Sequence, residues 1–213
     1  RIDMMVLSHF DLDHVGEAHH IISRMAVDHI YVNPNDPGFQ AWYEDMPDAF
    51  QGVLVDALHI RELQVGDIAI RRLFPGPAHS DDDPNRNSLV LEVETGSYNF
   101  LFTGDTDQEM EQLWVSEAGK IEADVLKLAH HGSDTSTGEY FIANADFTYG
   151  LVSAGAGNRY GHPHREVLER AGGMALLDTS KHGMVRFKID GREMCIETKL
   201  DPSLNHCIKK RAE

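Results

Sequence analysis

Two histidines and two aspartates lie within six residues near the start of the chain, in the stretch SHFDLDH at Ser8–His14. An apolar run at Met4–Leu7, extended by Ile2, stands directly before them and is typical of a buried strand. The strand is therefore expected to end in a polar cluster formed by His9, Asp11, Asp13 and His14. Polar clusters at strand ends are where binding sites tend to be built, because the sheet holds them in place.

These four side chains are of the types that bind metal ions. In an extended or turning segment, residues i and i+2 point to the same side. His9 and Asp11 can therefore approach one ion, and Asp13 and His14, on the following turn, can approach a second. Imidazole and carboxylate ligands suit Zn, Mn or Fe, and additional carboxylates favour the harder ions. The alternative interpretation is an acidic turn with two surface histidines, but the density of ligand-type side chains favours a metal centre.

Hydrophobic periodicity divides the rest of the chain into short strands and helices. Strands are expected at 28–32, 68–74, 88–94, 98–103, 125–129, 147–153, 175–178, 184–189 and 194–198. Helices are expected at 18–25, at 39–58 with an interruption at Met46-Pro47, at 108–117 and at 163–171. The pattern departs from the strict strand-helix-strand rhythm of a Rossmann sheet. An α+β fold, layered as an αββα sandwich, fits better and would bring the polar strand ends to one edge of a sheet.

Three further segments next to strands or helices carry ligand-type residues. Asp105 follows a hairpin strand and a glycine, where its carboxylate can bridge two ions, although Gly-Asp is also an ordinary turn. His130 and His131 follow an apolar strand, and adjacent side chains point to opposite sides, so only one reaches a given ion. The other is left to orient a ligand or to act as acid or base. His162 lies at the mouth of a helix, as a ligand or a loop histidine, and His164 is expected to be exposed.

The composition restricts the class of protein. The chain has 213 residues, of which 41% are hydrophobic, enough for one large domain with its own core. A formal net charge of −16 argues against a non-catalytic nucleic-acid-binding module, which is usually basic. No stretch is long and apolar enough to span a membrane, and no signal peptide is present. Because the chain starts at Arg1, we interpret it as a fragment of a longer protein. Cys195 and Cys207 form either a disulfide or two free thiols, which leaves the redox compartment open.

Taken together, these motifs resemble the metallo-β-lactamase superfamily, whose signature is His-x-His-x-Asp-His after a strand, then a bridging Asp and a later His. Here the stretch is HFDLDH, with Asp11 in place of the second histidine. The order SHFDLDHVG, NSLVLEV, FLFTGD, ADVLKLAHHGSDTS and NRYGHP is similar to one branch, the C-terminal hydrolase domain of ComEC-type DNA-internalisation competence proteins. Related secreted phosphodiesterases share parts of this order of motifs. The resemblance runs from about Met5 to about Ile189.

The resemblance implies roles for individual residues. It implies two ligand sets: for the first metal His9 and Asp11 with His130 or His131, and for the second metal Asp13 and His14 with His162. It implies that Asp105 bridges both metals. The catalytic residues that it implies are Asp13, His130 and His131, with the spare histidine protonating the leaving group. Four further polar residues match the branch, and contact with a substrate phosphate is considered for the last two: Asn87, Ser88, Ser133 and Ser136.

The resemblance also carries two departures. Glu17 stands where the family usually has a second glycine, and the strands that normally precede the motif are missing. The expected fold is therefore a metallo-β-lactamase-like αββα sandwich without its N-terminal strands, forming a single domain over residues 1–213.

The function implied is that of a binuclear phosphodiester hydrolase with two divalent ions, Zn²⁺ or Mn²⁺. By resemblance the substrate is DNA degraded during uptake, and the full-length chain would include a membrane channel domain, with this part a soluble, extracytoplasmic domain. No stable protein partner is evident. The alternatives are a small-molecule phosphodiesterase or other ester hydrolase of the same fold, and a non-catalytic metal-binding domain.

Overall fold

A computed structural model of the chain describes residues 1–211. These residues form three sheets. The first sheet is parallel, with the order β1 (Ile2–Val6), β2 (Val27–Val32), β3 (Leu54–Asp56). The second has seven strands, in the order β10 (Ala175–Asp178), β9 (Ala145–Val152), β8 (Ile121–Lys127), β7 (Tyr98–Phe102), β6 (Val90–Thr95), β5 (Ile68–Phe74), β4 (Glu62–Val65). The third is antiparallel, with the order β11 (Val185–Asp190), β12 (Glu193–Thr198), β13 (His206–Lys209).

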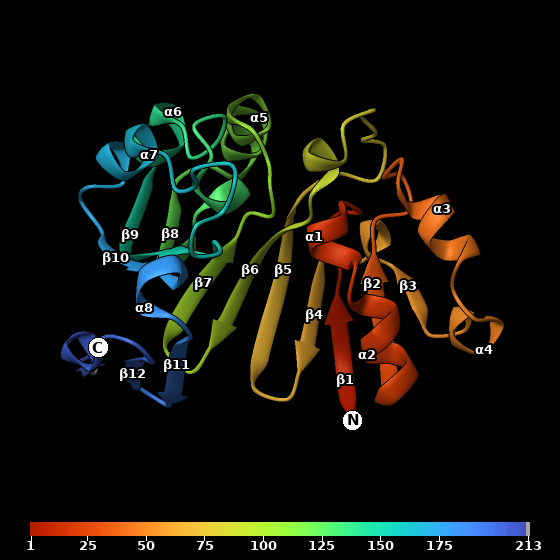
Figure 1. Cartoon of the computed structure of the whole chain (residues 1–213), viewed down its shortest axis with the longest axis horizontal. Coiled ribbons are helices and arrows are strands. Elements are labelled where there is room, and N and C mark those ends of the chain that lie inside the picture. Colours follow the sequence, from red (N-terminus) through yellow and green to blue (C-terminus); the bar gives the residue numbers. More distant parts are fainter. Residues whose placement is uncertain (212–213) are drawn as a thin grey trace.

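Helices cover the outer layers. Those on the first sheet's side are α1 (Leu12–Val15), α2 (Ala18–Arg24), α3 (Phe39–Glu44) and α4 (Asp48–Gln51). Those on the seven-stranded sheet's side are α5 (Gln108–Ala118), α6 (Glu139–Ala143) and α7 (Arg165–Arg170), and α8 (Thr179–His182) follows β10. Short 3-10 turns lie at Ala57–His59, Pro84–Asn87, Ala129–Gly132 and Pro202–Leu204. Figure 1 shows α5, α6 and α7 gathered at one end of the molecule and α2, α3 and α4 at the other.

The seven-stranded sheet packs on both faces. Its residues on one face, such as Val90 and Leu101, join the cluster with Trp114 of α5. On the other face, Leu91 packs with the β1 and β2 layer, and Phe100 packs with β12. Alternation along each strand produces this division, because successive side chains point to opposite faces. The layering is the expected α+β sandwich, and the polar strand ends meet at one side of it.

The segment 39–58 differs from the expected helix. Met46-Pro47 ends α3 early, as expected from the missing amide hydrogen and the fixed backbone of proline. Beyond α4, however, the chain forms β3, in which Leu54 pairs with Ile30 of β2. The prediction of helix through the end of this segment was wrong. Pairing with the free edge of β2 favours an extended backbone here over the helix that a short apolar pattern indicated. The edge strands β4 and β13 were not predicted either.

Cys195 and Cys207 are joined by a disulfide. They face each other across β12 and β13, as register partners in the third sheet. This resolves the alternative that the sequence left open. Among residues 1–211, no helix is both long and apolar enough to cross a lipid bilayer.

Candidate metal centre

Segments that follow strands of the first sheet and of the seven-stranded sheet bring their ligand-type residues to one place. His9 follows β1, and Asp13 and His14 lie on the short helix α1 that comes next. Asp105 follows β7, and His131 follows β8, which is parallel to β7. Because the carboxyl ends of neighbouring strands meet at one sheet edge, residues more than a hundred positions apart become neighbours.

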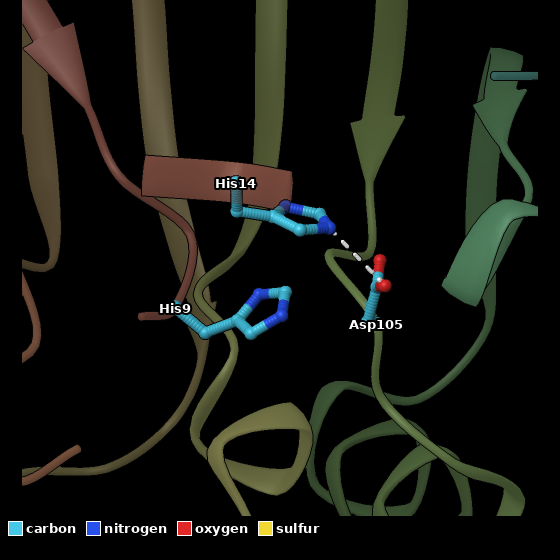
Figure 2. A group of neighbouring side chains, drawn as sticks. All are labelled: His9, His14 and Asp105. Carbon is cyan, nitrogen blue, oxygen red and sulfur yellow. Dashed lines mark hydrogen bonds and ion pairs between the residues drawn. The ribbon is translucent and has the colours of Figure 1, made fainter. Parts of the chain in front are cut away.

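One group of possible ligands consists of His9, His14 and Asp105, whose ligand atoms all lie within 4.8 Å of one another. Figure 2 shows the two imidazole rings and the carboxylate turned toward a common point, with His14 Nε2 3.2 Å from Asp105 Oδ2. The side chain of His9 is fully buried, and its Nε2 has no hydrogen-bond partner among residues 1–211. A buried imidazole nitrogen without a partner is costly unless a ligand satisfies it. Its orientation therefore fits a metal ion.

Two serines hold the far sides of these rings. The Ser8 hydroxyl lies 3.2 Å from His9 Nδ1 and 3.1 Å from His14 Nδ1. The buried Ser88 hydroxyl lies 3.2 Å from His9 Nδ1 and accepts a 3.0 Å hydrogen bond from the amide of Asp105. Occupying Nδ1 leaves Nε2 as the ligand atom and fixes the ring. The polar position predicted at Ser88 thus contacts the ligand groups from behind.

The second group consists of Asp13, His14 and His131. His131 Nε2 lies 3.2 Å from Asp13 Oδ2 and 3.2 Å from His14 Nε2. Its Nδ1 donates to the carbonyl of Ser153 at 2.7 Å, which leaves Nε2 unprotonated when the ring is neutral. His14 belongs to both groups. The grouping differs from the two predicted ligand sets, because His14 lies with His9 as well as with Asp13, and His131 lies with Asp13.

The backbone at this turn is strained. His130 and His131 have φ of 48° and 55°, in the left-handed region that non-glycine residues rarely adopt. Each such residue costs on the order of 1–3 kcal/mol. Gly132 follows at φ 85°, where a Cβ would lie 2.7 Å from Pro163. The packing around the turn therefore holds this backbone in place. It orients His131 toward Asp105, while His130 lies at the cavity wall.

Asp105 is the electrostatic centre of the cluster. Its Oδ2 lies 3.2 Å from both His14 Nε2 and His131 Nε2, while its Oδ1 accepts from Lys127 at 3.1 Å. Burial alone would raise the pKa of Asp105, but hydrogen bonds from His131 and His14, with the charge of Lys127, hold this pKa well below its usual range. The hydrogen bond to Asp105 in turn raises the pKa of His131. The carboxylate is thus ionised, with one oxygen free for shared ligation.

Lys127 was not predicted as part of the site. The signal in the sequence was a lysine between two leucines at the end of the strand that follows the Gly-Asp motif. In the structure, Lys127 Nζ also donates to the carbonyl of Gly104 at 2.8 Å. A cation in a buried strand needs partners, and these two contacts provide them.

A cavity of about 410 Å³ opens over the cluster. Six of the predicted site residues line it: Asp11, Asp13, Asp105, His130, His131 and His162. His9 and His14 belong to the ligand groups without lining it. Its wall also includes residues that were not predicted: Ser153, Ala154, Gly155, Asn158, Tyr160 and Thr179.

Some predicted residues stand apart from the two groups. Asp11 is half-buried, with its Oδ2 3.9 Å from His9 Nε2, and burial together with the neighbouring Asp13 raises its pKa. His130 and His162 have ring centroids 5.7 Å apart at the cavity wall. Burial and the nearby His164 lower the pKa of His162. The ligand role of these three residues stays a prediction, as does that of the residues in the two groups.

Four other polar residues lie outside the cavity lining. Ser133 and Ser136 are buried and do not line the cavity, so their considered contact with a substrate phosphate is not supported. Their hydroxyls contact Thr135 instead. Asn87 is buried and binds the backbone of the aspartate-rich loop before it. His164 is half-buried rather than exposed, and its Nδ1 accepts from the amide of Asp134.

Comparison with known proteins gives the following matches. A family model described as the metallo-beta-lactamase superfamily matches residues 1–156. "ComE operon protein 3" of Bacillus subtilis (strain 168) is 35% identical over 202 residues, covering 90% of this chain and 25% of the relative. "Competence protein ComA" of Neisseria gonorrhoeae is 34% identical over 192 residues, covering 88% and 25%. The chain thus spans about a quarter of the length of these relatives.

Solved structures of low sequence identity share the fold. The metallo-beta-lactamase fold protein YhfI from Bacillus subtilis superimposes with a TM-score of 0.52 at 13% identity, covering 83% of this chain and 73% of that one. At this identity, the likeness shows the architecture alone.

Proposed function

From the premise that this chain belongs to the metallo-beta-lactamase superfamily, we propose that it is a binuclear phosphodiester hydrolase that acts on DNA. The fold of this family indicates a metal-dependent hydrolase, which the sequence also predicted. The observation that carries the proposal is the pair of ligand groups that share His14 beneath one open cavity. A structural metal site would be closed, whereas a catalytic one keeps an open side.

The donor set fits two divalent transition-metal ions. His9 and His14 with Asp105 would hold one ion, with Asp11 at the cavity side, and Asp13 with His131 would hold the other. Imidazole and carboxylate together suit Zn²⁺ or Mn²⁺. When bound, two such ions supply an activated water and stabilise charge that develops on a phosphoryl oxygen.

The chain's own residues would do the remaining work. Asp105 keeps the two groups together, because Lys127 holds one of its oxygens and leaves the other between the histidines. His130 lines the cavity outside both ligand groups, with Nδ1 3.5 Å from the Thr135 hydroxyl. It is therefore the residue available to give a proton to the leaving oxygen.

DNA is proposed as the substrate on the strength of the relatives, of which one is named a competence protein and another a ComE operon protein, together with the sequence resemblance. We further propose that this part of the protein lies outside the cytoplasm, attached to a membrane channel domain. The disulfide between Cys195 and Cys207 supports this, since disulfides persist mainly in oxidising compartments.

The test is cleavage of single-stranded DNA by purified protein after dialysis against chelator and reloading with Mn²⁺ or Zn²⁺. We expect metal-dependent cleavage by the wild type and none by the double variant Asp11→Ala/Asp13→Ala. A matched control replaces Asp45 and Asp48, which are exposed and lie outside the cavity, by alanine. Equal cleavage by the Asp11/Asp13 variant would refute the site.

A small phosphodiester is the second candidate substrate. The chain's charge of −16 and the compact cavity of about 410 Å³ favour it over a long polyanion. Turnover of a small diester without turnover of DNA would select this alternative. Stoichiometric metal binding without either activity would point to a non-catalytic metal-binding domain.

A further inference from the structure

Tyr160 presents an aromatic ring at the wall of the metal cavity. Tyr160 is 60% exposed, and it lines the same cavity as Asp13, Asp105 and His131. The proposed chemistry does not use it. A single exposed ring is ordinary on a protein surface, and what distinguishes Tyr160 is its position at the wall of this cavity.

The ring continues a series of rings that leads away from the metal centre. The planes of His131 and His162 are inclined by only 16°, with centroids 6.4 Å apart. Tyr160 is inclined by 23° to His162, with centroids 5.6 Å apart. A flat group stacked on Tyr160 would therefore be inclined by at most 39° (16° plus 23°) to the ring of His131 and would lie farther out from the candidate metal centre.

The loop fixes the position of this ring. Asn158 receives a hydrogen bond from the amide of His162 at 2.9 Å and donates to its carbonyl at 2.6 Å. The side-chain amide of Asn158 also donates to the carbonyl of Gly155 at 3.0 Å. Tyr160 lies inside the turn that these bonds close. Its ring is thus presented by an ordered turn, which lowers the entropic cost of binding.

Arg159 lies against this ring. Its guanidinium carbon is 4.7 Å from the ring centroid, and the group donates to the Tyr160 hydroxyl. Arg159 is exposed and forms no ion pair with any residue in 1–211. An exposed cation–π contact contributes about 0.5–1 kcal/mol, whereas base–aromatic stacking contributes about 1–3 kcal/mol. A base can therefore displace the guanidinium, which is then free to contact a phosphate.

The overall charge gives base stacking on Tyr160 a particular value for binding a nucleic acid. With a net charge of −16, the chain cannot attract a polyanion by its general field. Stacking does not depend on charge, and every base has a flat face. A ring beside the metal centre would supply affinity where long-range electrostatics oppose it.

We propose that Tyr160 and Arg159 form a nucleobase-binding subsite, in which the Tyr160 ring stacks on a base next to the phosphodiester at the metal centre. This rests on the proposed function and narrows its substrate to strands with an unpaired base at the cleavage site. The base must leave its own stack to reach the ring, as is typical of proteins that bind single strands.

The test compares two oligonucleotides of equal length, one with bases and one in which tetrahydrofuran abasic units replace them. For the wild type, kcat/KM should be higher on the base-bearing strand. In Tyr160→Ala this preference should fall by about 5- to 150-fold, the equivalent of 1–3 kcal/mol, mainly through KM. Tyr160→Trp should retain it. Tyr140→Ala, an exposed tyrosine on α6 outside the cavity, is the matched control.

Equal losses on both strands, or loss of bound metal in Tyr160→Ala, would mean that the ring only supports His162 and would overturn the subsite. If the wild type cleaves neither strand, the proposed function fails, and the subsite is then tested by equilibrium binding of the same two strands to metal-loaded protein. Weaker binding of the base-bearing strand by Tyr160→Ala would uphold it. Equal binding by the wild type and Tyr160→Ala would refute it.

Discussion

At the residue scale, contacts behind the candidate ligands position them as much as the backbone does. Ser8 and Ser88 hold the Nδ1 atoms of the histidines, and Lys127 holds Asp105. None of the three faces the cavity. Residues that orient ligands in this way commonly change metal affinity or activity by about 10- to 100-fold when replaced.

Replacement of Lys127 by methionine tests this role. The variant removes the cation that holds Asp105 Oδ1, so the carboxylate loses its fixed orientation. We expect metal affinity or metal-dependent turnover to fall about 10- to 100-fold. Titration with Mn²⁺ or Zn²⁺ measures it. Lys120→Met, at an exposed position with surface ion pairs, is the control and should behave as the wild type. Unchanged metal binding in Lys127→Met would contradict the assigned role.

His9 predicts a pH dependence of the metal-free protein. Burial, reinforced by His14, lowers its pKa from 6.5 to about 3. Between pH 3 and pH 6.5, the His9 ring is protonated in the unfolded chain and neutral in the folded chain. The free energy of unfolding should therefore be highest above pH 6.5 and fall toward pH 3 by roughly 3 to 5 kcal/mol.

Urea unfolding in chelator, repeated from neutral pH down to about pH 4, measures this slope. His9→Gln should be less pH-dependent than the wild type over the same range, because the replacement does not titrate. His29→Gln, at an exposed position, should keep the wild-type slope. Identical slopes for the wild type and His9→Gln would show that His9 titrates normally.

At the element scale, the loop 133–138 is held from two sides. The buried carboxylate of Glu111 on α5 accepts from the amides of Thr137 at 2.6 Å and Gly138 at 2.8 Å. Arg170 of α7 donates to the carbonyls of Thr137 and Ser136. This loop continues from the strained turn at His131, so α5 and α7 help to fix the position of one candidate ligand without contacting it.

Glu111→Ala should therefore be destabilising. It leaves two buried amides without an acceptor, at a cost of roughly 2 to 5 kcal/mol, and it should also reduce turnover because the turn at His131 loosens. Denaturant unfolding and the DNA cleavage rate measure the two effects. Glu117→Ala, exposed on the same helix, is the control. A variant as stable as the wild type would show that water replaces the carboxylate.

Elements also show what the sequence could predict. The cluster at His9–His14 and the strand ends at Asp105 and His130-His131 could be found, because each is local: an apolar strand followed by ligand-type residues. The edge strand β3 and the contact of Lys127 with Asp105 could not, because both depend on pairing between distant segments. The placement of His131, rather than His130, in a candidate ligand group depends on the left-handed backbone of this turn, which the sequence does not reveal.

At the scale of the whole molecule, the layers place two independent sheets around one centre. His9 and His14 come from the β1 side, and Asp105 and His131 come from the seven-stranded sheet. Ions bound between them would link the two halves of the sandwich. Bound ligand stabilises the folded state by mass action, so removing the ions should lower the thermal midpoint.

Metal stoichiometry tests the central claim most directly. Elemental analysis of protein equilibrated with Zn²⁺ or Mn²⁺ and then freed of loose ions should give about two ions per chain. In Asp13→Ala/His14→Ala, which removes residues of both ligand groups, the count should fall well below the wild-type value. A wild-type chain that holds no ion, or a variant that keeps the full count, would contradict the binuclear centre.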